Sequence, residues 1–192
     1  MNIEYEATFP DVDKDDVRER LRLSGALLVR PEYVQKRKTF HLPKEKRSEN
    51  AWLRVRDEGN KITMSLKTVD GDTITDQKEI CLSVNDFSFA CELLGMIGCK
   101  EKSYQVTKRE LWKLDGVEIT IDEWPFLEPF IEVEGDSEES VKHVSEELGL
   151  NYSEALFCAV GTLYQRKYGV TLDEINNQTP RLDFDGPNPF AS

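Results

Sequence analysis

Two kinds of hydrophobic spacing alternate along the chain, and each predicts one kind of element. Alternation of apolar and polar residues with a period of two is typical of strands that bury one face. It predicts strands at 2–9, 34–42, 51–57, 61–69, 73–82, 104–114, 117–123 and 129–134. Apolar residues at helical spacing predict helices at 13–28, 85–97, 137–148 and 153–168.

Short glycine-containing segments separate several of these strands. Turns at 57–61, 69–73 and 114–118 carry hairpin signals, so the strands that they join are expected to be antiparallel neighbours. We expect residues 1–175 to form one domain. Residues 176–192 are rich in Asn, Asp, Pro and Gly and have no period, which predicts a flexible tail that lies outside the fold or drapes over it.

The polar faces of the predicted strands are segregated by charge. In the first strand Glu4, Glu6 and Thr8 share one face, opposite Ile3, Tyr5 and Ala7. Other strands carry charges of one sign on their polar faces: Arg54 with Arg56, Lys61 with Lys67, Glu118 with Asp122, and Glu132 with Glu134. A sheet with one wet face explains the alternation itself. It does not explain like charges on one strand face, which repel unless a counter-charge, a metal or a ligand compensates them.

Enclosing these charges resolves the difficulty. We predict an α+β fold, a closed antiparallel eight-stranded β-barrel, or tunnel, with a charged lumen and with helices packed outside. Eight strands enclose about one small ligand. Clustered carboxylates suit Mg²⁺ or Mn²⁺, and arginine and lysine side chains suit phosphate oxygens. Such a lumen matches a complex of a metal ion with a polyphosphate.

Composition narrows the classes of partner. The net charge of −12 over 192 residues argues against a nucleic-acid-binding surface, which must be basic. No apolar run reaches the length of a membrane span, so we expect a soluble, cytoplasmic protein with no membrane partner. The four cysteines are scattered and are expected to be free thiols, and two histidines are too few for a histidine-based metal centre.

Several segments in consistent order resemble one family. The Glu-x-Glu pair at 4–6, "WLRVR", "MSLK", "VTKRELW" and "ITIDEWPFLEPFIEVEG" are similar to the CYTH family, or triphosphate tunnel metalloenzymes. That family includes class IV adenylyl cyclases, thiamine triphosphatases and inorganic triphosphatases. The resemblance runs from about residue 2 to residue 168.

The resemblance implies roles for individual side chains. It implies metal ligands at Glu4, Glu6, Asp122, Glu132 and Glu134. It implies triphosphate ligands at Arg54, Arg56, Lys67, Lys78, Lys108, Arg109 and Arg166. The Lys78 and Arg109 assignments depend on strand register, Lys108 competes with Arg109, and Arg166 or Lys167 would act from a C-terminal helix that closes the tunnel. The catalytic set would be Glu4, Glu6, Lys67 and Glu134.

Two positions depart from the family pattern. Thr8 stands where the family's Glu-x-Glu-x-Lys signature has lysine, and His41 stands where relatives often have aspartate. The expected function is therefore Mg²⁺- or Mn²⁺-dependent hydrolysis of a small triphosphate-bearing substrate, namely tripolyphosphate, thiamine triphosphate or a nucleoside triphosphate. A class IV adenylyl cyclase ranks second, because no base pocket is evident, and Thr8 keeps a non-catalytic nucleotide or polyphosphate binder open. A homodimer formed through exposed helices also stays open.

Overall fold

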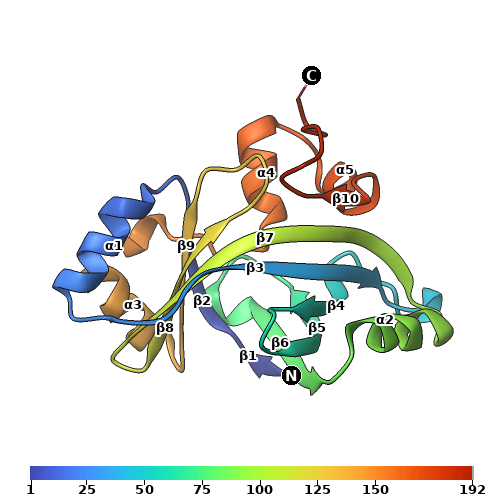
Figure 1. The fold of residues 1–192 in the computed structure, drawn as a ribbon, viewed down its shortest axis with the longest axis horizontal. Coiled ribbons are helices and arrows are strands. Elements are labelled where there is room, and N and C mark those ends of the chain that lie inside the picture. The colour runs from blue at the N-terminus through green and yellow to red at the C-terminus, as the bar shows by residue number, and fades with distance from the viewer. Residues whose placement is uncertain (192) are drawn as a thin grey trace.

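The computed structural model describes residues 1–191, which form a barrel-like sheet with helices around it and over one end (Figure 1). The strands are β1 (Asn2–Ile3), β2 (Tyr5–Phe9), β3 (Leu27–His41), β4 (Ala51–Asp57), β5 (Ile62–Val69), β6 (Gln77–Val84), β7 (Lys100–Leu114), β8 (Val117–Glu123), β9 (Phe130–Gly135) and β10 (Arg181–Leu182). The α-helices are α1 (Lys14–Leu23), α2 (Phe87–Met96), α3 (Glu138–Glu147), α4 (Gly161–Tyr168) and α5 (Leu172–Asn177).

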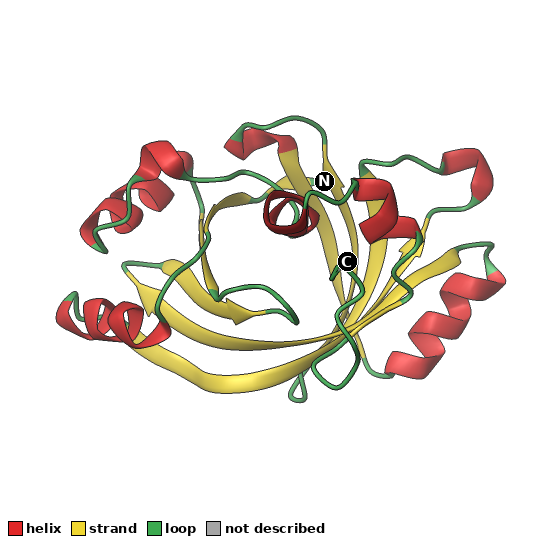
Figure 2. Cartoon of the chain, turned by 90° about the horizontal axis from the view of Figure 1, so that it is seen from above, coloured by secondary structure: helices red, strands yellow, loops and turns green. Residues whose placement is uncertain are grey.

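The N-terminal segment joins the two edges of the sheet. The strand order is β1-β6-β5-β4-β3-β7-β8-β9-β2, and every neighbouring pair in it is antiparallel. The chain bends at Glu4, so β1 pairs with β6 at one edge while β2 pairs with β9 at the other. Figure 2 shows from above how the strands curve round into a ring. The predicted closed, eight-stranded barrel is thus corrected to nine strands in a nearly closed ring, with β10 added beside β7. Only Asn2 and Ile3 pair with β6, which is why the ring is only nearly closed.

Helices cover the outer face of the barrel, as the apolar faces of the strands predict. Val17 and Leu21 of α1 and Val141 of α3 pack in one core with Ile119 and Val133 of the sheet. A second core places Ala90 and Leu94 of α2 against Phe40 and Val55. Burial of these apolar side chains turns the charged faces of the same strands inward.

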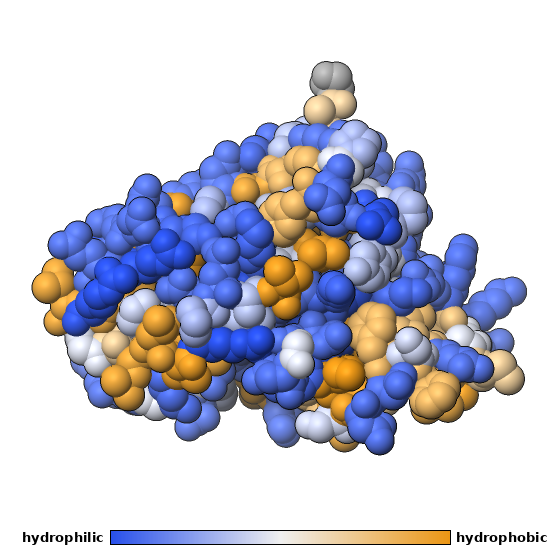
Figure 3. All heavy atoms as spheres, viewed as in Figure 1, coloured by the Kyte–Doolittle hydropathy of each residue, from blue (hydrophilic) through white to orange (hydrophobic). Residues whose placement is uncertain are grey.

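The opposite face of α2 is exposed. Phe89, Leu93 and Met96 are more than half exposed, and Figure 3 shows apolar atoms gathered at the lower right, where α2 lies in Figure 1. No helix among residues 1–191 has the length and apolarity needed to cross a membrane.

Two predicted helices were too long. The one predicted at 13–28 ends at Leu23, because Gly25 adopts a positive φ of 77° and β3 begins two residues later. In the one predicted at 153–168, Leu156 instead pairs with Thr8 through two backbone hydrogen bonds of 2.9 Å. The α-helix of this region, α4, begins only at Gly161.

Residues 176–191 lie against the barrel. The strand β10 runs parallel to β7, with Arg181 opposite Tyr104 and Leu182 opposite Gln105. The ring of Phe190 packs against that of Tyr164 of α4, with centroids 4.9 Å apart. The C-terminal segment therefore covers one side of the barrel end, above β7 in Figure 1.

Candidate functional site

The barrel encloses a cavity of about 520 Å³. Its lining contains seven carboxylates and six basic side chains, although the whole chain has a net charge of −12. The carboxylates are Glu4, Glu6, Glu49, Glu79, Glu118, Glu132 and Glu134. The basic side chains are Arg37, Arg54, Arg56, Lys67, Lys102 and Arg109. The lumen is thus charged and close to balanced.

Three adjacent strands form an acidic wall. Glu6 of β2 is in register with Glu134 of β9, which is in register with Glu118 of β8. Paired residues on neighbouring strands have Cα atoms about 4.5–5.5 Å apart, so these carboxylates form one row. Glu132 lies in the next row of β9, opposite Thr8.

Glu6 is a buried carboxylate without a direct partner. It is 9% exposed, and its carboxylate makes no hydrogen bond or ion pair with any described residue, because Lys67 pairs with Glu4 instead. Burial, followed by the charge of Glu132, raises the pKa of Glu6 well above its usual value. A buried carboxylate without a cation is costly, so this row of oxygens has a strong electrostatic preference for a bound positive charge.

Glu4 and Glu79 share a lysine. Lys67 Nζ lies 2.9 Å from Glu4 Oε2 and also lowers the pKa of Glu79. Burial raises the pKa of Glu4 to about 7 against the effect of Lys67. Burial acts the same way on Glu79, but Lys67 and Arg54 outweigh it and bring the pKa of Glu79 to about 2. Glu79 is therefore the ionised partner of the basic residues.

The opposite wall is basic. Arg54 Nη2 donates to Glu79 Oε1 at 3.0 Å, and Arg56 Nη2 lies 2.7 Å from Glu58 Oε1. Among the described residues, Arg37 donates to neutral acceptors only, Gln35 Oε1 at 2.5 Å and Thr107 Oγ1 at 2.6 Å.

Arg37 is incompletely paired. It is 4% exposed, and burial and the nearby Arg56 and Arg54 lower its pKa well below the usual value. The Nε atoms of Arg37, Arg54 and Arg56 are buried without a hydrogen-bond partner in residues 1–191. Unpartnered donors that line a cavity are suited to an anion.

Arg109 connects the two walls. Its Nε donates to Asp122 Oδ1 at 2.8 Å, and its Nη2 donates to Glu132 Oε2 at 2.5 Å. Asp122 has no exposed surface and also accepts a hydrogen bond of 2.6 Å from Thr120 Oγ1. Asp122 thus lies behind the cavity surface, where it holds Arg109 in place.

The structure brings seven of the sequence-derived candidates together in the cavity lining, besides Arg109. They are Glu4, Glu6, Arg54, Arg56, Lys67, Glu132 and Glu134. It places four others elsewhere: Asp122 beneath Arg109, Lys78 on the exposed face of β6, Lys108 in an ion pair with Glu123, and Arg166 on the exposed face of α4. Thr8 is buried and His41 half-buried, and neither lines the cavity.

The sequence analysis assigned no site role to five charged residues of the lining, which are Arg37, Glu49, Glu79, Lys102 and Glu118. For Glu79 the resemblance assigned its neighbour Lys78 instead, and Lys102 gave no signal in the sequence. The signal for Glu79 and Arg37 was strand parity, since both lie on the charged faces of their strands.

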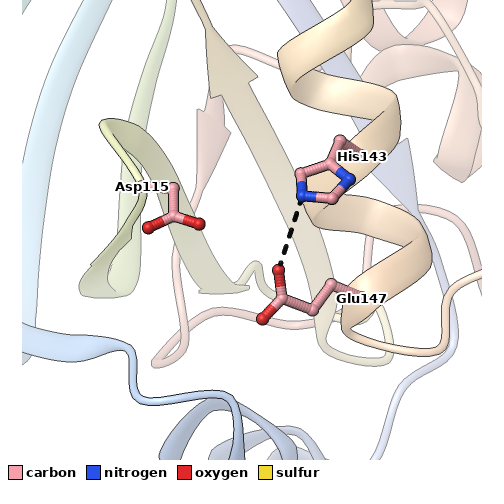
Figure 4. A group of neighbouring side chains, drawn as sticks. All are labelled: Asp115, His143 and Glu147. Atoms are coloured by element: carbon pink, nitrogen blue, oxygen red, sulfur yellow. Dashed lines mark ion pairs between the residues drawn. The ribbon is translucent and has the colours of Figure 1, made fainter.

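Two further groups carry side chains that could act as a nucleophile or bind a metal. Cys158 lines the cavity, but burial raises the pKa of its thiol to about 11, so it stays protonated at neutral pH. On the outside of the barrel, Asp115, His143 and Glu147 come within metal-chelating distance of one another (Figure 4). All three are exposed, and exposed acidic groups of this kind are common without a metal.

Comparison with known proteins gives one family match for the sequence and several solved structures with a similar fold. Residues 2–159 match the CYTH domain. A conserved hypothetical protein from Pyrococcus furiosus is 23% identical with a TM-score of 0.69, covering 83% of this chain and 99% of its own. A candidate adenylate cyclase from Vibrio parahaemolyticus is 11% identical with a TM-score of 0.71, covering 85% of this chain and 98% of its own.

A third solved structure is from Hippeastrum and is described as a candidate adenylyl cyclase with a dominant triphosphatase activity. It is 14% identical with a TM-score of 0.57, and the match covers 88% of this chain and 99% of its own. No curated protein matches this chain. At these identities the structural matches show the fold alone.

Proposed function

Because the chain belongs to the CYTH domain family, we propose that it is a Mg²⁺- or Mn²⁺-dependent phosphohydrolase that acts on a triphosphate-bearing substrate inside the barrel. One observation carries the proposal. The buried carboxylate of Glu6 and the buried guanidinium of Arg37, neither of which forms an ion pair with a described residue, belong to the acidic and the basic wall of one cavity. A complex that contains both a cation and a polyanion satisfies both.

The acidic wall fits a hard divalent cation. Glu4, Glu6, Glu132 and Glu134 all line the cavity and offer only carboxylate oxygens, the donors that Mg²⁺ and Mn²⁺ prefer. We assign these four residues as its ligands. Asp122 supports them through Arg109 and Glu132 and does not reach the cavity surface. When bound, the cation would polarise phosphate oxygens and so favour attack by water on phosphorus.

The basic wall supplies the remaining stabilisation. Arg37, Arg54 and Arg56 present forked donors that match phosphate oxygens, and they would offset charge that develops in the transition state. Lys67, already 2.9 Å from Glu4, would contact the substrate where the acidic and basic walls meet. The barrel holds these groups on rigid strands, so positioning and electrostatics supply most of the catalysis.

Two other functions use the same phosphate site. A cyclase would direct the ribose 3′-hydroxyl of ATP to the α-phosphorus and expel pyrophosphate, and the Vibrio and Hippeastrum structures motivate testing it. A binder without turnover is motivated by Thr8, whose buried hydroxyl stands in place of the family's lysine and has no hydrogen-bond partner in the part of the chain that the structure describes.

The products of one incubation separate the three functions. Purified protein is mixed with tripolyphosphate, thiamine triphosphate or ATP, each with Mg²⁺ or Mn²⁺. Metal-dependent release of phosphate supports the hydrolase, cyclic AMP with pyrophosphate supports the cyclase, and saturable binding without products supports the binder. If Thr8→Lys produces turnover in a protein that otherwise only binds, the natural chain is a repurposed member of the family.

A further inference from the structure

The cavity extends beyond its charged walls to the C-terminal segment. Five lining residues come from residues 172–182, and none of them is charged: Leu172, Ile175, Asn176, Thr179 and Leu182. We refer to these residues as the C-terminal wall. The match to the CYTH domain ends at residue 159, so this wall lies outside the part of the chain that the family defines.

Backbone pairing holds the C-terminal wall in place. β8 pairs with β7 only from Lys108 to Leu114, which leaves the edge of β7 free nearer its start. β10 takes that free edge at Tyr104 and Gln105. Ser103 Oγ donates to the carbonyl oxygen of Thr179 at 2.8 Å, and Thr179 Oγ1 donates to the carbonyl oxygen of Glu174 at 3.0 Å. The wall is therefore an ordered extension of the sheet.

A polar pair lies on this wall. Lys102 Nζ donates to Asn176 Oδ1 at 3.3 Å, and both residues line the cavity. Lys102 forms no ion pair with any described carboxylate. The amide of Asn176 has further hydrogen-bonding capacity, because its NH₂ group donates to no described residue. Apolar side chains beside a lysine and an amide suit a ring with apolar faces and polar edges.

The cavity volume is consistent with two kinds of lining, the charged walls and the less polar C-terminal wall. Inorganic tripolyphosphate needs cationic donors alone, and Leu172 and Ile175 offer it nothing. A cavity of about 520 Å³ lies within the range of sites that enclose drug-sized organic ligands. The lining is thus larger and more apolar than an inorganic anion requires.

We infer that the C-terminal wall binds the organic group of the substrate, which is therefore a triphosphate ester of a ring-bearing alcohol and not inorganic tripolyphosphate. Leu172 and Ile175 cover the apolar faces of the ring, and Asn176 with Lys102 binds its polar edge. This inference rests on the proposed function, since it takes the charged walls as the triphosphate site.

The test compares affinities within one protein. Titration calorimetry of the full chain with Mg²⁺, over times short relative to turnover, gives dissociation constants for tripolyphosphate, thiamine triphosphate, ATP, GTP, CTP and UTP. We expect at least one organic triphosphate to bind about tenfold or more tightly than tripolyphosphate. Asn176→Ala is expected to lower that ratio about tenfold, as loss of a buried hydrogen bond does.

Asn177→Ala is the matched control. Asn177 lies next to Asn176 on α5, is exposed and does not line the cavity, so this substitution should change the ratio less than about twofold. Lys102→Met is a second variant on a different element and is expected to lower the ratio as well. Melting temperatures of all three variants establish that they fold.

Three results would contradict the inference or the proposed function. If tripolyphosphate binds as tightly as every organic triphosphate, or if Asn176→Ala and Lys102→Met both leave the ratio unchanged, the inference is wrong while the proposed function stands. If tripolyphosphate and all the organic triphosphates fail to bind, the proposed function itself fails.

Discussion

Replacing Arg37 by methionine should stabilise the free protein against unfolding and weaken its binding of triphosphate. Arg37 is 4% exposed and has no carboxylate partner, and Arg54, Arg56 and Arg109 all lower its pKa. A buried, uncompensated cation costs several kcal/mol. Against this, its hydrogen bonds to Gln35 and Thr107 and its contact with a tryptophan ring contribute about 1–3 kcal/mol.

The difference gives the expected stability change. We expect Arg37→Met to raise the free energy of unfolding by about 1–2 kcal/mol, because methionine retains the apolar stem and removes the charge. For a chain of this size, each kcal/mol raises the melting temperature by about 2–4 °C. Loss of charged hydrogen bonds to phosphate, about 1.5–3 kcal/mol, should weaken binding of tripolyphosphate about 10- to 100-fold.

Arg109→Met is the matched control, because the charge of Arg109 is compensated. Removing it leaves Asp122, which has no exposed surface, and Glu132 without their cation, so the protein should lose about 3–5 kcal/mol. Thermal unfolding by circular dichroism and calorimetric titration with Mg²⁺-tripolyphosphate measure both quantities. If Arg37→Met lowers the stability by more than about 1 kcal/mol and leaves the affinity unchanged, Arg37 is a structural residue and the reasoning fails.

Three further predictions concern the metal, the acidic wall and pH. Mn²⁺ at about 100 times its dissociation constant should stabilise the protein by about 2.7 kcal/mol, and excess EDTA should abolish the gain. Glu6→Gln should raise the melting temperature in EDTA and reduce the gain from Mn²⁺, whereas Glu139→Gln, on the exposed surface of α3, should do neither. Burial lowers the pKa of Lys102 to about 8. At this one group the unfolded chain therefore binds more protons than the folded chain between about pH 8 and 10.5, so Lys102 contributes stability that rises with pH over this range. The free energy of unfolding of Lys102→Met, compared with that of the unsubstituted protein at each pH, should lack this contribution.

The charged faces were predictable because strand parity does not depend on the tertiary fold. Glu4, Glu6, Arg54, Arg56 and Lys67 all lie on the faces that alternation assigns to them, and all line the cavity. Once one face of each strand is apolar, helices outside and charges inside follow from burial alone. The enclosed arrangement of these residues was therefore accessible from the sequence.

The register of the strands and the orientation of the C-terminal helix could not be predicted from the alternation of apolar and polar residues. The Lys78 assignment came from the resemblance, whose register could slip by one residue, and the structure places the neighbouring Glu79 in the cavity lining instead. Arg166 depended on the direction of a helix whose first residue, Gly161, lies eight positions after the predicted start at 153. The C-terminal wall depends on a free edge of β7, which is a property of the assembled sheet.

The most direct measurement is a crystal structure of the protein with Mn²⁺ and tripolyphosphate, in which anomalous scattering locates the metal. We predict an anomalous peak bonded to carboxylate oxygens of Glu6 and its neighbours on the acidic wall. The triphosphate should lie between that peak and the guanidinium groups of Arg37, Arg54 and Arg56. A cavity without metal or triphosphate, with Mn²⁺ found only at the exterior group of Asp115, His143 and Glu147, would contradict the account.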